Sequence, residues 1–219
     1  MTEQTDALFT GSALARLVDL AAASRNPGAA ALEDELQRFS RLMQDSHAIA
    51  WVMPFDVVAS LLDGLADEYG TERFAARPPV FRARLARAAG DEPVAAFLRS
   101  LAALVRDPWF GVCPGYDELP LSQWEALARF DVVNEFASQL PTGEYDRDPE
   151  SEARALVAMD HPDCHGRIAD LAGQLQRVLY MFRSPAELDA AFGPVMPSVT
   201  HARLRLLLDA VHAHFTEWH

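Results

Sequence analysis

Lysine is absent from this chain of 219 residues, and all 19 basic residues are arginines. Without a lysine ammonium group, the chain cannot form a Schiff base with pyridoxal phosphate, and it cannot build the lysine-dependent phosphate grip of a P-loop. Pyridoxal-phosphate enzymes and ordinary P-loop NTPases are therefore excluded. The use of arginine in place of lysine, together with abundant alanine, is typical of a GC-rich bacterial genome.

Cysteine and long apolar runs are also scarce. The chain has two cysteines, Cys113 and Cys164, which are too few for a disulfide scaffold or for a zinc site made of cysteines alone. No apolar run approaches the roughly 20 residues that a membrane-spanning helix needs. The acidic start of the chain lacks the basic segment of a signal peptide. We therefore expect a cytoplasmic protein that has no membrane partner.

Negative charge is in clear excess. The 32 acidic residues outnumber the arginines and give a formal net charge of −13. Nucleic-acid binding needs a basic surface that neutralises phosphates, so the composition argues against a nucleic-acid partner. An acidic surface instead speeds association with a protein that has a basic surface.

Spaced apolar residues predict helices along most of the chain. The clearest stripe is formed by Ile168, Leu171, Leu175, Val178 and Phe182, which recur at i, i+3, i+7, i+10 and i+14. Similar patterns predict helices over 6–24, 29–48, 54–69, 71–89 with a break at Pro78–Pro79, 91–106, 122–139, 149–159, 184–192 and 200–219. No convincing strand is found. We expect an all-α, single-domain helical bundle of about nine or ten helices with short loops.

One longer, aromatic-rich loop is expected over residues 107–121, where the chain could be weakly subdivided. It contains Trp109 and Tyr116, which could line a ligand pocket or anchor a partner. The alternative is that these aromatic side chains pack beneath the loop as a small satellite core.

The densest set of potential metal ligands lies directly before the clearest helix. Within residues 160–165, His161, Cys164 and His165 offer nitrogen and sulfur donors for zinc or iron. The two histidines are four residues apart, but Pro162 suits the first turn of a helix, which would leave His161 outside it. The hypothesis is a metal site or an acid–base pair. The alternative is an exposed, well-capped helix start.

Four further histidines lie near the end of the chain, and we interpret them as part of a solvent-exposed polar face. His212 and His214 are two residues apart and point in different directions on a helix. His201 lies three turns before His212, too far to share a metal ion with it. His219 is expected to fray.

Arginines concentrate over residues 71–89, and two of them, Arg77 and Arg84, are candidates for binding a small anionic ligand. A guanidinium group can grip a phosphate or a carboxylate with two parallel hydrogen bonds. The alternative is that these arginines pair with carboxylates of the chain itself.

Two functions remain open. The leading hypothesis is a non-enzymatic acidic helical binding protein, an immunity-type or chaperone-type partner of a more basic protein, with no cofactor. The alternative is an enzyme or a small-molecule- or metal-binding protein, with zinc or iron and a pocket between helices near His161, Cys164 and His165, roofed by the 107–121 loop. The chain has neither a G-x-S-x-G elbow nor a Glu-x-x-His pair, so whether it is an enzyme stays open.

Overall fold

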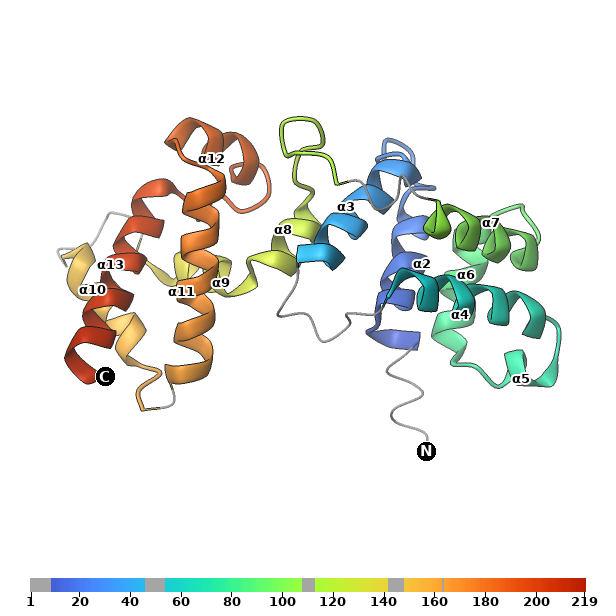
Figure 1. The fold of residues 1–219 in the computed structure, drawn as a ribbon, viewed down its shortest axis with the longest axis horizontal. Helices are drawn as coiled ribbons and strands as arrows, with labels where there is room; N and C mark the ends of the chain where they lie inside the picture. The colour runs from blue at the N-terminus through green and yellow to red at the C-terminus, as the bar shows by residue number, and fades with distance from the viewer. Residues whose placement is uncertain (1–8, 46–53, 108–112, 142–147, 163) are drawn as a thin grey trace. The chain divides into compact units, whose positions relative to one another are not determined.

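The computed structural model describes residues 9–45, 54–107, 113–141, 148–162 and 164–219. These residues form twelve helices, labelled α2 to α13, and no strand (Figure 1). The all-α prediction is confirmed, although the helices outnumber the nine or ten expected. None of the described helices combines the length and the apolar character needed to cross a bilayer.

The chain divides into two compact units, Met1–Leu119 and Pro120–His219. The boundary lies inside the 107–121 stretch where the sequence suggested a subdivision. The expectation of a single domain stays a prediction.

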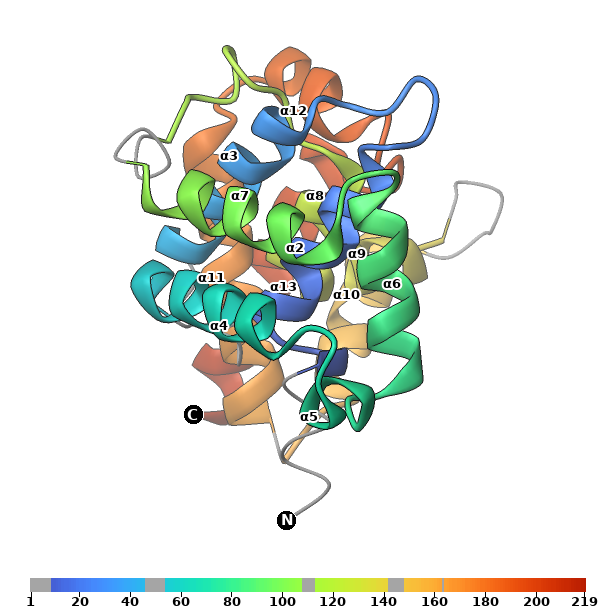
Figure 2. The ribbon, with the colours of Figure 1, turned by 90° about the vertical axis from the view of Figure 1, so that its right-hand side faces the viewer.

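The first unit is built around its first described helix, α2. Its helices are α2 (Ala13–Ala23), α3 (Leu32–Asp45), α4 (Phe55–Glu68), α5 (Glu72–Ala75), α6 (Pro79–Ala89) and α7 (Val94–Arg106). Helix α2 packs against α3, α4 and α6, and α4 lies beside α7 (Figure 2). Leu14, Leu17 and Val18, which the α2 stripe places inward, are fully buried.

A proline and an arginine define the two ends of α6. The break predicted at Pro78–Pro79 is present, and Pro79 starts α6 because its fixed φ and missing N–H suit a first helical position. At the other end of α6, the guanidinium of Arg25 donates to the carbonyls of Ala88 (3.1 Å) and Ala89 (3.2 Å). These bonds satisfy carbonyls that the end of a helix leaves unpaired.

The second unit is organised around its last helix, α13. Its helices are α8 (Gln123–Arg129), α9 (Asp131–Gln139), α10 (Pro149–Ala158), α11 (Cys164–Met181), α12 (Pro185–Phe192) and α13 (His201–Trp218). Helix α13 packs against α9, α10, α11 and α12. All five residues of the stripe predicted on α11 are buried, because a period of 3.6 residues turns them to one side of the helix.

The helix predicted over 122–139 is two helices, which is one reason why the count is higher. The chain leaves the helical conformation at Phe130, where φ is −130° and ψ is 38°. Phe130 is buried. Asp131 is the first residue of α9, and its side chain accepts the N–H of Val132 (2.9 Å). The break is stabilised by α11, since Gln174 Oε1 accepts the N–H of Val133 (3.2 Å).

Candidate metal centre

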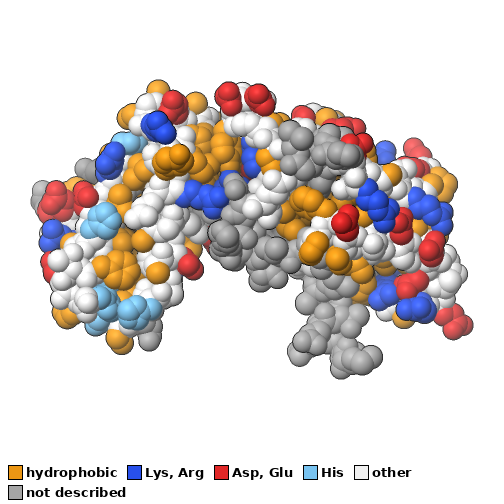
Figure 3. All heavy atoms as spheres, in the orientation of Figure 1, with side chains coloured by type: hydrophobic (Ala, Val, Ile, Leu, Met, Phe, Trp, Pro, Cys, Tyr) orange, Lys and Arg blue, Asp and Glu red, His pale blue; other side chains and the backbone are white. Residues whose placement is uncertain are grey.

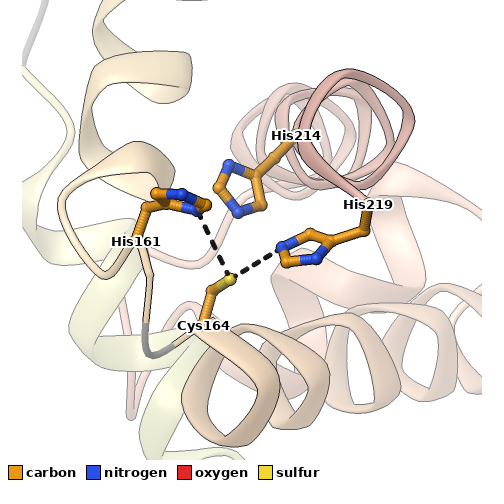
Figure 4. Close-up of side chains that lie close together, drawn as sticks. All are labelled: His161, Cys164, His214 and His219. Carbon is orange, nitrogen blue, oxygen red and sulfur yellow. Dashed lines mark hydrogen bonds between the residues drawn. The ribbon is translucent and has the colours of Figure 1, made fainter.

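Two separate parts of the second unit bring four potential metal ligands together. His161 lies in the turn after α10, where its N–H donates to Ala158 O (3.1 Å), and Cys164 is the first residue of α11. His214 lies near the end of α13, and His219 follows as its C-cap residue. Because α13 packs against both α10 and α11, its C-terminal end meets the turn between them (Figure 4).

The dimensions of this group suit one transition-metal ion. The donor atoms of His161, Cys164, His214 and His219 all lie within 4.8 Å of one another. Cys164 Sγ is 3.0 Å from Nε2 of His219 and 3.9 Å from Nδ1 of His161. With zinc bonds of about 2.0–2.3 Å, the donors of a tetrahedral site are about 3.3–3.7 Å apart. Movements of a few tenths of an ångström to about one ångström therefore bring the four donors to coordination distance.

The three imidazole rings are spaced almost equally. The ring centroids of His161 and His214 are 5.7 Å apart, those of His161 and His219 are 5.8 Å apart, and those of His214 and His219 are 5.6 Å apart. An ion bonded to one nitrogen of each ring at about 2.0 Å would hold the centroids about 5 Å apart. The rings thus surround a space that one ion would fill.

His214 is the buried member of the three histidines. His214 is only 4% exposed, and its Nε2 has no hydrogen-bond partner in the described part of the chain. A buried polar atom left without a partner costs about 1–3 kcal/mol. Coordination of an ion would supply the missing partner, so this atom is the strongest single indication of a ligand at the site.

Local electrostatics favour the metal-binding form of His219. Desolvation, followed by the positive charges of His165, His214 and His161, lowers the pKa of His219. A lower pKa favours the neutral imidazole, which is the form that coordinates a metal.

The same cysteine and histidine could in principle form a nucleophilic pair. Cys164 Sγ lies 3.0 Å from Nε2 of His219, within reach of a general base. Cys164 is 0% exposed, however, so a substrate carbonyl cannot reach its sulfur in this conformation. A buried thiol among imidazoles suits an ion better than a substrate.

The three residues predicted as metal ligands have different positions. His161 and Cys164 belong to the group of four. His165 lies beside it, with its ring centroid 4.6 Å from that of His219, but its donor atoms fall outside the group.

Sequence reasoning assigned the two remaining donors to a solvent-exposed face. For His214 that interpretation is wrong, because the residue is buried. The signal was present in the sequence: Leu204, Leu207, Val211 and His214 recur at i, i+3, i+7 and i+10, so His214 continues the apolar stripe of α13.

The arginine candidates contact carboxylates of their own unit. Arg77 pairs with Glu68 (2.7 Å) and lies over the ring of Phe9 (4.9 Å), while Arg84 pairs with Asp19 (3.2 Å). The cavity beside Arg77 measures about 110 Å³, and typical ligand pockets are about 300–1,000 Å³. A role in anion binding stays a prediction.

The described part of the aromatic loop is fixed by Arg41 on α3. The guanidinium lies 4.1 Å from the ring centroid of Tyr116. It also donates to the carbonyls of Pro114, Gly115 and Leu119. Tyr116 thus has a protein partner, and its predicted role in ligand binding stays a prediction. Trp109 lies outside the described residues.

Comparison with known proteins assigns no family to the chain. No protein-family model, no curated protein and no solved structure matches it.

Proposed function

We propose that this chain is a zinc-binding helical protein, in which His161, Cys164, His214 and His219 hold one Zn²⁺ ion. The observation that carries the proposal is the buried, unpartnered Nε2 of His214, which lies in a group whose donor atoms are within 4.8 Å of one another. In this role the ion fastens the end of α13 to the turn between α10 and α11.

The donor set favours zinc over iron. Three imidazoles and one thiolate match the nitrogen and sulfur ligands of tetrahedral zinc sites, whereas the non-haem iron of oxygenases takes two histidines, a carboxylate and open positions. Four protein donors fill a tetrahedral shell, which is typical of structural rather than catalytic zinc. A reducing, cytoplasmic location would suit the site, since the Cys164 thiol must stay reduced to bind the ion.

Metal analysis of the purified protein tests this function. We expect one equivalent of zinc per chain, lost in Cys164→Ser and His214→Gln. His212→Gln is the matched control, because His212 is exposed and lies on the same helix as His214. Circular dichroism of each variant separates loss of metal from loss of the fold. A metal-free wild-type protein that stays metal-free after incubation with zinc would rule the proposal out.

Cobalt substitution identifies the donors directly. Co²⁺ in a four-coordinate site with a thiolate ligand gives intense visible bands and a sulfur-to-cobalt charge-transfer band in the near ultraviolet. We expect both in the wild-type protein. Cys164→Ser should remove the charge-transfer band, while the His212→Gln control should keep it.

Our second proposal is that the chain is an acidic binding protein, of the immunity or chaperone type, for a more basic partner protein. It is supported by charge that is negative in both parts of the sequence: residues 1–119 carry 17 acidic residues and 11 arginines, and residues 120–219 carry 15 and 8. A partner isolated by affinity capture should be basic, and its affinity should fall steeply as salt rises. An affinity that is insensitive to salt would contradict this mechanism.

A further inference from the structure

The four donors of the metal centre differ in how firmly they are held. Cys164 is fully buried at the start of α11, and His214 is buried between packed helices. His161 is exposed and lies in a hydrogen-bonded turn, and its ring packs against that of Trp218 with the centroids 5.1 Å apart. His219 is an exposed C-cap residue, bonded to α13 through its N–H to Phe215 O (3.2 Å). The two exposed donors, His161 and His219, are therefore held less firmly than the two buried ones.

A fourth imidazole, that of His165, stands next to the exposed His219. His165 follows Cys164 on the first turn of α11 and is exposed. Its ring meets the ring of His219 edge to face, at an interplanar angle of 60° and a centroid separation of 4.6 Å. Histidine side chains gather on the surface at this end of α13 (Figure 3). Because exposed side chains change rotamer within nanoseconds, a movement of His219 would leave His165 free to turn toward the candidate site.

We propose that His165 is an alternative fourth ligand, which exchanges with His219 while His161, Cys164 and His214 keep hold of the ion. This inference rests on the proposed zinc site. In the exchange, a bond from zinc to a nitrogen of His165 forms and the bond to Nε2 of His219 breaks. Both imidazoles are neutral when they bind, so the charge of the complex does not change and no redox step is involved.

This exchange would make the zinc ion transferable. A closed four-donor site must lose a ligand before an incoming chelator can bind, whereas a site with two competing histidines on its solvent side opens and closes without losing the ion. The metal would then be loaded and released at the face formed by His165 and His219. The site would act as an exchangeable zinc store or sensor, and not as a structural site whose zinc ion stays bound.

A double-mutant cycle on the full chain tests the exchange. Zinc affinity is measured by competition with a chromophoric chelator for the wild-type protein, His165→Gln, His219→Gln and the double variant. If His165 replaces His219, each single variant still binds one zinc ion. The zinc affinity of the double variant should then be about tenfold lower than the value expected if the affinity losses of the two single variants simply multiplied. Additive effects would overturn the exchange while leaving the zinc site in place.

Release kinetics give an independent readout. Transfer of zinc from the protein to excess chelator should slow several-fold in His165→Gln, with little change in equilibrium affinity, and should be unchanged in His212→Gln. A release rate that His165→Gln does not alter would overturn the inference. A wild-type chain that binds no zinc would instead overturn the proposed function itself.

Discussion

In this lysine-free chain, single arginine side chains donate hydrogen bonds to several backbone carbonyls at helix ends and in a loop. Arg25 donates to two carbonyls at the end of α6, and Arg41 donates to three carbonyls of the 113–119 segment. Arg203 donates to the carbonyl of Ala137 in the last turn of α9 and to that of Pro141, which follows the helix. A guanidinium group offers five N–H donors in a planar fork, so one side chain can satisfy several carbonyls at once. A lysine ammonium group lacks this fixed fork.

Substitution of Arg203 tests the difference between a guanidinium fork and a lysine ammonium group as donors to these carbonyls. Arg203→Ala leaves carbonyls at the end of α9 without their donors, where the bonds measure 2.8 and 3.2 Å. We expect the free energy of unfolding to fall by about 1–3 kcal/mol. Arg203→Lys should recover only part of this loss. Chemical denaturation measures both, with Arg205→Ala, an exposed position on the same helix, as the control. Full recovery by lysine would contradict the role of the fork.

The residues of the candidate metal centre could be predicted only in part. His161 and Cys164 were found because they lie close together in the sequence. His214 lies 50 residues after Cys164, and nothing local indicates that the two residues meet. Its burial could be read from the stripe of α13, but its neighbours depend on how α13 packs against the α10–α11 turn, which is a tertiary contact.

Among the elements, α9 depends most clearly on a neighbouring helix for its N-terminus. Gln174 on α11 accepts the N–H of Val133 (3.2 Å) and donates to Asp131 Oδ1 (3.0 Å). The side chain thus acts as an N-cap from outside the helix. We expect Gln174→Ala to lower the free energy of unfolding by about 0.5–2 kcal/mol, the usual cost of losing a cap.

Gln176→Ala is the matched control for this change. Gln176 is exposed on the same helix, so the two substitutions alter helix propensity equally. Equal effects in the two variants, measured by thermal or chemical unfolding, would show that the contact with α9 adds nothing.

The helices could be predicted from the sequence wherever their buried residues recur with the helical period. The stripes of α2 and α11 were predicted because one buried face recurs every 3.6 residues. The break at Phe130 was missed because Phe130 is apolar and fits the helical pattern, while the interactions that stabilise the break come partly from Gln174, 44 residues later. Similarly, Val57 on α4 is apolar but 44% exposed, since a neighbouring element decides which apolar residues of a helix are covered.

At the scale of the whole molecule, the two units offer a built-in comparison. All four proposed zinc ligands belong to Pro120–His219, and none belongs to Met1–Leu119. A ligand that binds only the folded state stabilises the part of the protein whose opening would break the site. The effect of zinc should therefore be confined to one half of the sequence.

Hydrogen exchange with and without zinc tests this expectation. We expect zinc to slow amide exchange in the last turn of α13, in the α10–α11 turn and at the start of α11, because opening any of them separates the ligands. Peptides from α2, α4 and α7 should exchange at the same rate in both samples. In His214→Gln, zinc should no longer protect the second unit, whereas in His212→Gln the protection should persist. Protection spread equally over both units, or retained in His214→Gln, would mean that zinc binds somewhere else, since the ligands of the proposed site all lie in these three segments of the second unit.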